Sequence, residues 1–389
     1  MARKGIARTS AAALKRALGS NDAAYRLLKK VAYFLISIVK VLGSVSPRNL
    51  AYFIFPEPAG FAGYVTRVDT RDIAGVAFCR EGEPPVAVQL LVDGAVVNTT
   101  YATQKVLGPS KFAGTTIGFH FPMKGIWKHV RKDQVLQVLA NGKPLRFRAG
   151  FGPGKPLTNK GVRKLSERGI VALTAEGNLI NKFGRIQRPK DESRDWAEKT
   201  FGNYADLNAV FEREFGISLF VFYGAMLGYA REGGILAHDL DLDLAYFSEK
   251  TNPDDVRLEF YAITKRLMSV GVQAVPFTYK LQFKGSGLSV TPCWISDSGF
   301  SSTFGYVGDD YRVTREDILP LRKAEHDGHA LNLPNNPQAV AAYLYGHGWK
   351  YPDPGWKWLP EYKNRPQILA ARLTDRDVRE LQAFSEQAT

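Results

Sequence analysis

Residues 223–247 read YGAMLGYAREGGILAHDLDLDLAYF and contain the strongest indication of the fold. Its later part alternates acid and leucine with a period of two, which is typical of a strand with one buried face. We expect the leucines to face a core and the acids to face the opposite side, with neighbouring acids about 7 Å apart. The leucines are Leu240, Leu242 and Leu244, and the acids are Asp239, Asp241 and Asp243.

This acid ladder has two interpretations. Aspartate is a poor strand former, and three carboxylates in a row repel one another. A divalent cation among them would make the arrangement favourable, because Mg²⁺ and Mn²⁺ take oxygen ligands from a few carboxylates together with substrate phosphates. The alternative is an exposed strand edge whose charges prevent aggregation.

The residues before the acids favour the metal site. The apolar run 219–223 predicts a buried strand, Gly224 and Ala225 predict a turn, and a helix is expected from about Met226. A strand, a glycine turn and a helix N-terminus present backbone N–H groups that can bind a phosphate. Arg231 and the Gly233–Gly234 loop follow. A phosphate cradle next to carboxylates suggests metal-assisted chemistry on a phosphate ester.

The pattern GxxxGxxRxGGILAHDLDLD over residues 224–243 resembles the signature of the LicD/fukutin family. Segments 280–290, 318–337 and 345–349 resemble later parts of the same family, so the resemblance covers about residues 195–355. It implies a nucleotidyltransferase-type fold. It also implies the transfer of an alcohol phosphate from a CDP-activated donor to a glycan.

The resemblance implies roles for particular residues. The three acids would hold Mg²⁺ or Mn²⁺ and serve in catalysis, one of them orienting or deprotonating the acceptor hydroxyl. Arg231 would neutralise charge on the leaving CMP. The expected substrate-binding residues are Gly224, Ala225, Arg231, Gly233, Lys280, Gln282, Asn335 and Asn336. Solvated strand positions for Lys280 and Gln282, and a helix cap for the asparagines, are the structural alternatives.

The chain differs from the family pattern at three positions. Ala225 stands where the family usually has a hydroxyl residue, and Leu240 replaces the middle acid of its acidic run. Thr291 stands where the family usually has another aspartate. Asp297, in the loop that follows, is a candidate to replace that missing carboxylate.

The distribution of charged, apolar and turn-forming residues along the chain predicts three segments. Residues 1–55 are expected to form a basic amphipathic helical segment, and residues 56–150 an accessory β-sandwich with hairpin turns at Asp93–Gly94 and Asn141–Gly142. Residues 151–389 would form the phosphotransferase domain, with helices at 193–215 and 252–268 and another after Asn336. The fold class is therefore α+β, with helices on a modest mixed sheet. The prolines near the end surround Trp349, Trp356 and Trp358, which are expected either to stack on sugars or to pack on the core.

Charge and cysteine content bear on location. The net charge is +14, and residues 1–40 hold nine of the Lys and Arg residues against one acid. The apolar segment 31–39 is too short to span a membrane. It would either anchor the chain to an anionic membrane surface or pack on the protein's own core. Two isolated cysteines, Cys79 and Cys293, indicate a reducing compartment. We expect a cytoplasmic protein. If segment 31–39 is a membrane anchor, we expect peripheral attachment to the inner face of the cytoplasmic membrane.

The leading hypothesis is a metal-dependent phosphotransferase that moves ribitol, glycerol or choline phosphate from a CDP-linked donor to a cell-surface or lipid-linked glycan. One alternative is a nucleotidyltransferase that moves NMP to a sugar or phosphate acceptor. Another is a non-catalytic glycan- or nucleotide-binding module. Nucleic acid is not an expected partner, because no recognition motif accompanies the basic charge.

Overall fold

The computed structural model describes residues 62–79, 83–106, 115–147, 164–189, 193–239, 241–308 and 311–387. They belong to one compact unit, Ala62–Thr389. The expected N-terminal segment, Leu240 and both predicted domain boundaries lie outside the described residues, and the boundaries remain predictions. Among the described helices, none is both long enough and apolar enough to cross a membrane.

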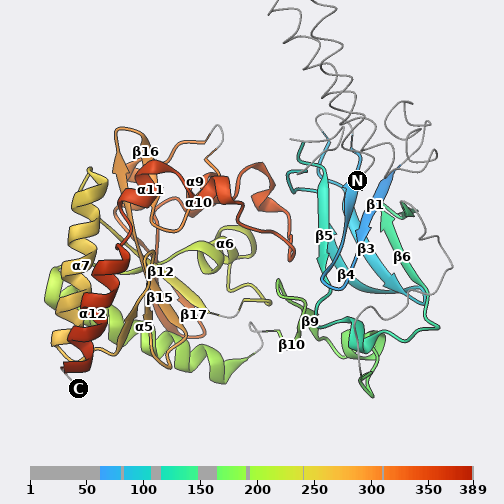
Figure 1. Cartoon of the computed structure of the whole chain (residues 1–389), viewed down its shortest axis with the longest axis horizontal. Coiled ribbons are helices and arrows are strands. Elements are labelled where there is room, and N and C mark those ends of the chain that lie inside the picture. Colours follow the sequence, from blue (N-terminus) through green and yellow to red (C-terminus); the bar gives the residue numbers. More distant parts are fainter. Residues whose placement is uncertain are drawn as a thin grey trace, which may run out of the picture. The chain divides into compact units, whose positions relative to one another are not determined.

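The first half of the described chain forms two four-stranded sheets that share one hydrophobic core (Figure 1). The sheet orders are β5-β2-β1-β8 and β4-β3-β6-β7. Strand β1 pairs with β8 in parallel, and the other pairs are antiparallel. The strands are β1 Gly63–Val68, β2 Asp72–Ala77, β3 Ala87–Val92, β4 Ala95–Tyr101, β5 Gly118–Pro122, β6 Leu136–Ala140, β7 Lys143–Pro144 and β8 Arg146–Phe147.

Both predicted hairpin turns of this sandwich are confirmed. Asp93 and Gly94, with φ of 49° and 79°, join β3 to β4, and Asn141 and Gly142, with φ of 46° and 74°, join β6 to β7. Two successive positive φ angles match the twist of a hairpin, and Asp, Asn and Gly tolerate them best.

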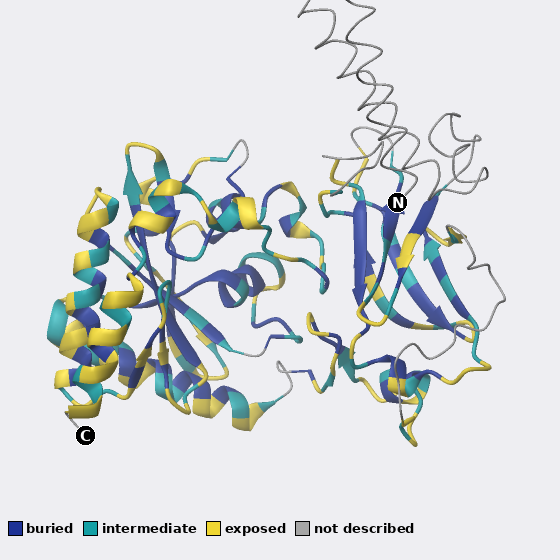
Figure 2. Cartoon of the chain, in the orientation of Figure 1, coloured by how far each residue is buried: buried dark blue, intermediate teal, exposed yellow. Residues whose placement is uncertain are grey.

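The second half is built on a six-stranded mixed sheet of order β11-β12-β15-β14-β13, with β16 also paired to β15. Strands β12 and β15 are parallel and the other pairs are antiparallel. With its helices, this sheet confirms the predicted α+β class, and Figure 2 shows its central strands buried. The strands are β11 Phe220–Val221, β12 Leu242–Phe247, β13 Ala274–Pro276, β14 Leu281–Phe283, β15 Leu288–Ser296 and β16 Gly299–Ser302.

The predicted helices form where their start and stop signals lie. Helix α7 begins after Asn252, whose side chain accepts a hydrogen bond from the Asp254 N–H at 2.8 Å. Asn336 caps α9 in the same way, accepting from the Ala339 N–H at 3.2 Å. Asx side chains before a first-turn proline are typical helix starts. The helices of this half are α5 Arg194–Phe215, α6 Tyr223–Glu232, α7 Pro253–Ser269, α8 Arg315–Ile318, α9 Pro337–Tyr345, α10 Pro360–Lys363, α11 Pro366–Ala370 and α12 Asp375–Gln387.

These helices cover the sheet and position its strand ends. Helix α7 packs on β13 and β15, and α12 packs along α7 (Figure 1). Helix α5 packs on β15, and α6 packs on both β12 and α9. The remaining elements are η1 Trp127–His129, α4 Ile170–Ala175, β9 Leu179–Ile180, β10 Ile186–Gln187, β17 Arg322–His326, β18 His329–Leu333 and η2 His347–Lys350.

Candidate active site

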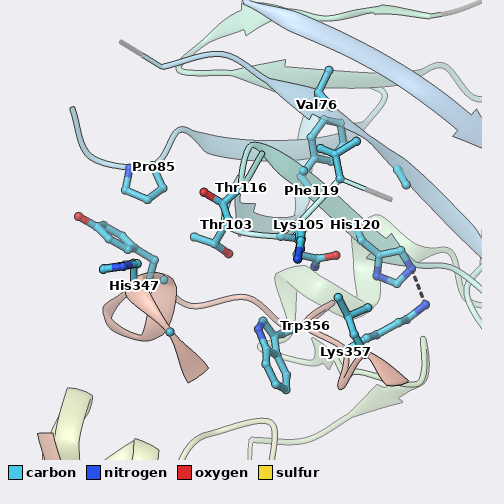
Figure 3. A pocket seen from close by; sticks show the side chains of 18 of the residues that line it. Val76, Pro85, Thr103, Lys105, Thr116, Phe119, His120, His347, Trp356 and Lys357 are labelled. Atoms are coloured by element: carbon cyan, nitrogen blue, oxygen red, sulfur yellow. Dashed lines mark hydrogen bonds between the residues drawn. The ribbon is translucent and has the colours of Figure 1, made fainter. Parts of the chain in front are cut away.

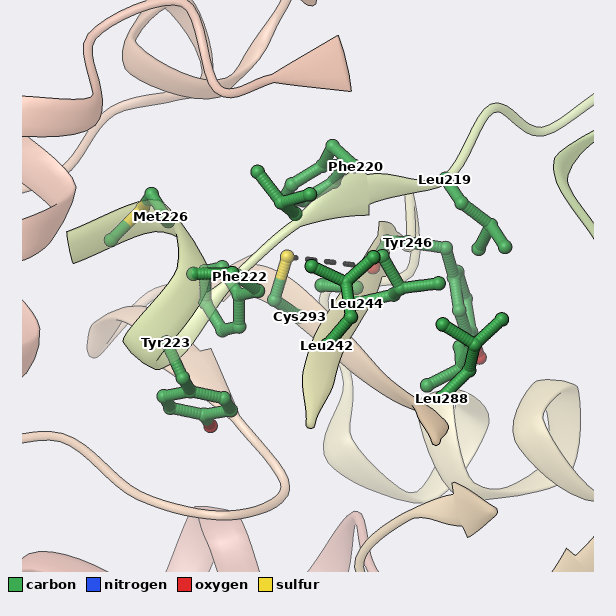
Figure 4. Packing of buried hydrophobic residues seen from close by; sticks show 14 of the residues in the cluster. Leu219, Phe220, Phe222, Tyr223, Met226, Leu242, Leu244, Tyr246, Leu288 and Cys293 are labelled. Carbon is green, nitrogen blue, oxygen red and sulfur yellow. Dashed lines mark hydrogen bonds between the residues drawn. The ribbon is translucent and has the colours of Figure 1, made fainter. Parts of the chain in front are cut away.

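The acid ladder lies at the start of β12. Leu242 and Leu244 are fully buried, as the alternation predicts, and Figure 4 shows them in the cluster with Phe220 and Phe222. Asp241 and Asp243 are partly exposed and line a cavity. The strand begins only at Leu242, so the first two acids precede it.

The junction before α6 differs from the prediction. Strand β11 ends at Val221, Phe222 is the N-cap residue and α6 begins at Tyr223, so Gly224 lies inside the first helical turn and no glycine turn separates strand from helix. The residue with positive φ is Tyr223 itself, at 44°. For a bulky residue this conformation costs about 1–3 kcal/mol. Buried contacts hold it: the Tyr223 hydroxyl lies 2.5 Å from Ser302 Oγ, and the ring packs edge-on against Trp358.

Gly224 makes room for a carboxylate. A Cβ at this position would lie 3.0 Å from Asp239 Oδ2 and 3.3 Å from Oδ1, so the Asp239 side chain lies directly against the first turn of α6. The positive end of the helix dipole favours a negative group there. Asp239 is 7% exposed. The glycine and the dipole together position the first acid of the ladder.

The three acids and several cations line one cavity of about 400 Å³. The cations are Lys182, Arg231 and Lys280. Arg231 also binds Glu232, with Nη2 lying 2.6 Å from Oε1. Aromatic side chains complete much of the wall: Tyr223, Tyr279, Phe304, Tyr345, Trp349, Tyr351, Trp356 and Trp358. Mixed charge within an aromatic wall is suited to a charged ligand with a ring.

The electrostatics of the cavity centre on Asp243. Burial and the neighbouring Asp241 carboxylate raise the pKa of Asp243. Ser289 opposes the rise by donating a hydrogen bond from Oγ to Asp243 Oδ1 at 2.6 Å, and the positive charges of Lys280 and Lys182 act in the same direction. A carboxylate whose pKa is raised is a better proton acceptor near neutral pH than an ordinary one.

His238 also lines the cavity, next to the acid ladder. Burial and the Arg231 charge lower the pKa of His238 to about 4, against an opposing effect of Glu232. Its imidazole is therefore uncharged at neutral pH.

These side chains fit a divalent cation only in one binding mode. Among the described residues, no group of three or more His, Cys, Asp and Glu side chains could hold a metal ion on its own. The repulsion between Asp241 and Asp243, which raises the pKa of Asp243, is the feature that a cation would relieve. Mg²⁺ usually binds through one or two carboxylates and completes its shell with water and substrate phosphate. The residues fit that mode.

Several residues predicted to bind substrate do not line this cavity. Ala225 is buried in α6, and Gly233 ends that helix with φ of 77°. Gln282 is exposed on β14. Asn335 donates to the Glu316 carbonyl at 2.8 Å, and Asn336 caps α9. Gly224, Arg231 and Lys280 do lie at the cavity.

The structure shows where Thr291, which differs from the family pattern, and Asp297, its candidate replacement, are located. Thr291 is buried and lines the cavity, on the same face of β15 as Ser289. Asp297 cannot replace the missing acid, because it is exposed beyond the far end of β15. Seven residues lie between Ser289 and Asp297, and these eight steps along an extended chain correspond to roughly 26 Å.

Sequence reasoning missed Lys182, Phe183 and Asp353. Lys182 and Phe183 lie in the turn between β9 and β10, and Phe183 is 52% exposed where it borders the cavity. The Lys182 ammonium lies 5.6 Å from the Phe183 ring centre. An isolated Lys-Phe pair carries no sequence signal, and only the fold brings it to the carboxylates.

The geometry defines a carboxylate-rich cavity at the end of a mixed sheet, beside a helix N-terminus. Residues 216–336 match the family model described as LicD/FKTN/FKRP, nucleotidyltransferase domain. This segment is thus a nucleotidyltransferase domain of the LicD/fukutin family, which confirms the resemblance found in the sequence. Members of the family are transferases, and the family suggests phosphotransferase-type activity on glycans. No curated protein sequence matches the chain significantly.

Proposed function

We propose that this protein transfers an alcohol phosphate from a CDP-linked donor to a hydroxyl of a cell-surface glycan. The observation that supports the proposal most strongly is that the three acids, Arg231 and Lys280 all face one cavity. All five lie within the segment that matches the transferase family.

The proposed reaction is a displacement at phosphorus. The acceptor hydroxyl oxygen forms a bond to the phosphorus of the alcohol phosphate, and the bond from that phosphorus to the oxygen of CMP breaks. The hydroxyl proton passes to a carboxylate, and CMP leaves with the electron pair. Asp243 is the proposed proton acceptor, because its carboxylate lines the cavity and is held in place by the hydrogen bond from Ser289.

The cavity side chains would supply positioning and charge. Lys182, Lys280 and Arg231 would bind the diphosphate oxygens, and the exposed Phe183 ring would stack on the cytosine base. One or two of the carboxylates of Asp239, Asp241 and Asp243, together with water and a substrate phosphate, would hold Mg²⁺ or Mn²⁺, which would stabilise negative charge on the diphosphate when bound. Catalysis of phosphoryl transfer consists mostly of such positioning and charge stabilisation.

The test measures CMP release from CDP-ribitol, CDP-glycerol and CDP-choline with Mg²⁺, Mn²⁺ or EDTA, in the presence of mixed glycan acceptors. We expect cation-dependent release from one donor and its loss in Asp243→Asn. Asp297→Asn is the matched control, because that carboxylate is exposed and far from the cavity. Full activity of Asp243→Asn would refute the assignment.

The identity of the transferred group separates the remaining functions. Phosphorus NMR of the product would show a phosphodiester to the alcohol if the proposal holds. A product that carries NMP would identify a nucleotidyltransferase. Cation-independent CDP binding without turnover of any donor would identify a binding module.

A further inference from the structure

A second and larger cavity, of about 1080 Å³, adjoins the carboxylate cavity. The two share five lining residues, namely Thr103, Tyr345, Gly348, Tyr351 and Trp356. The large cavity lies between sandwich strands and the segment that follows α9. Figure 3 shows Trp356, His347 and Lys357 on one side and Thr103, Thr116 and Phe119 on the other.

Specific contacts build this cavity. Asp353 is partly buried and accepts hydrogen bonds from Gln104 Nε2 at 2.8 and 3.0 Å, from Thr100 Oγ1 at 3.0 Å and from Thr103 Oγ1 at 3.2 Å. The same side chain accepts from the Gly355 N–H at 3.0 Å. One carboxylate therefore fastens the C-terminal segment to the sandwich beside the point where the two cavities meet.

Close backbone approach supports the same junction. A Cβ on Gly355 would lie 2.2 Å from the His120 carbonyl oxygen, and one on Gly348 would lie 2.8 Å from Thr103 Cβ. His120 Nδ1 lies 3.1 Å from the Gly355 carbonyl oxygen, which places the buried imidazole on this segment as well. The walls of the cavity are thus held at fixed positions.

The charges in the lining are largely balanced. Arg67 Nη2 lies 3.0 Å from Asp72 Oδ2, and Lys357 Nζ lies 3.6 Å from Asp72 Oδ1. Lys105 Nζ lies 2.8 Å from Glu361 Oε1. Arg67 and Lys357 share Asp72, and Glu83 is a second acid of the lining, so three cations face two lining carboxylates and Glu361, and the cavity offers little net charge to a polyanion.

The remaining lining combines aromatic faces with hydroxyl groups. Tyr351, Trp356 and Tyr362 are partly exposed, and Thr66 and Thr116 are exposed. Aromatic rings bury apolar faces, while hydroxyls donate and accept hydrogen bonds. A saccharide presents both kinds of surface. The volume is at the upper end of small-molecule pockets, at about 1,000 Å³, and is suited to several sugar units.

We propose that the large cavity binds an uncharged oligosaccharide segment of the acceptor glycan and directs its end through the shared residues to the carboxylates. This inference rests on the proposed function and adds the acceptor's chemical class and site. It also gives the sandwich a role, since strands β1, β2 and β5 form much of the binding wall.

Two variants test the proposal on the full chain. Thr116→Trp fills the cavity from an exposed position, and Tyr362→Ala removes an aromatic face; neither residue lines the carboxylate cavity. Thr99→Trp is the matched control, because Thr99 is exposed on β4 and lines neither cavity. Thermal melting verifies that each variant folds.

The first readout is binding, which does not depend on turnover. Tryptophan fluorescence is titrated with isomaltohexaose, cellohexaose and chitohexaose, and with dextran sulfate as the anionic comparator. We expect at least one neutral hexasaccharide to bind, with its Kd raised about tenfold in both variants and unchanged in Thr99→Trp. Binding of dextran sulfate alone, or of none of the probes, would overturn the proposal.

The second readout separates this proposal from the proposed function. CMP release to water, without acceptor, is expected to stay at the wild-type rate in both variants, while the acceptor KM rises about tenfold. Absence of CMP release in the wild type would count against the proposed function, and the binding titration would still decide the acceptor site. Unchanged acceptor KM in both variants would overturn the acceptor site alone.

Discussion

Three glycine-to-alanine substitutions test how tightly α6 positions the first acid. Gly224 and Gly228 lie in α6, and Gly202 lies in α5. In a helix interior, alanine is more favourable than glycine by about 1 kcal/mol. A Cβ on Gly202 would meet nothing within 4 Å. Gly202→Ala is therefore expected to raise the free energy of unfolding by about 1 kcal/mol and to leave activity unchanged.

Gly224→Ala gains part of this helix propensity, because Gly224 lies in the first turn of α6, but it places its Cβ 3.0 Å from Asp239 Oδ2. Ordinary contacts begin at 3.4 Å, so the carboxylate must move by about 0.4 Å. A misplacement of 1 Å can cost about 100-fold in rate, which makes the expected loss about five- to tenfold. The free energy of unfolding should stay within about 1 kcal/mol of wild type, because propensity and contact oppose each other.

Gly228→Ala introduces the closest steric contact of the three substitutions. Its Cβ would lie 2.3 Å from the Gly234 carbonyl oxygen, and backbone has to move. We expect a loss of about 1–3 kcal/mol in the free energy of unfolding. Urea denaturation and CMP release measure both quantities for all three variants. Wild-type activity in Gly224→Ala, or an equal activity loss in Gly202→Ala, would refute the positioning of Asp239 by this glycine.

Three further predictions concern side chains around the cavities. Ser289→Ala removes the 2.6 Å hydrogen bond to Asp243, and we expect a loss of about 10- to 100-fold in cation-dependent activity, read from a Mg²⁺ titration; an unchanged titration would contradict it. Thr291→Asp adds a buried carboxylate near Asp243, so the melting temperature should fall in EDTA and recover with Mg²⁺, and absence of recovery would argue against a cation site. Burial raises the pKa of Asp353 to about 6 from 3.8, so between these pH values Asp353 is protonated in the folded state and ionised in the unfolded state. The free energy of unfolding therefore falls by up to about 3 kcal/mol as the pH rises from about 4 to 6. Asp353→Asn should remove this pH dependence in urea unfolding at pH 4.5 and 7, and an equal dependence in both proteins would show that Asp353 is not its source.

Much of the fold could be predicted because local signals and tertiary structure agree. The hairpins at Asp93–Gly94 and Asn141–Gly142 form where positive φ is easiest, and Asn252 and Asn336 cap the expected helices. The alternation of Leu242 and Leu244 with Asp241 and Asp243 fixes which face of β12 is buried. These features depend on neighbouring residues, so the sequence contains the information.

The site was predictable only in part, because its geometry depends on distant contacts. A glycine was expected to make the turn before α6, whereas Tyr223 adopts the positive φ and is held by Ser302 and Trp358, 79 and 135 residues away. Lys182 reaches the cavity from the β9–β10 turn, and Asp353 from beyond α9. No local sequence pattern indicates these contacts between residues that are distant in the chain.

The arrangement of β12 and β15 explains how a strand can retain carboxylates that repel one another. The two strands are parallel and in register, so Asp243 lies beside Ser289, which donates a hydrogen bond to it. On the opposite face Leu242 and Leu244 are fully buried, and each buried leucine contributes about 1.5–3 kcal/mol. That burial can offset the unfavourable environment that raises the pKa of Asp243. Stability thus comes from the leucine face, while the acid face keeps a charge arrangement that only a bound cation or substrate would relieve.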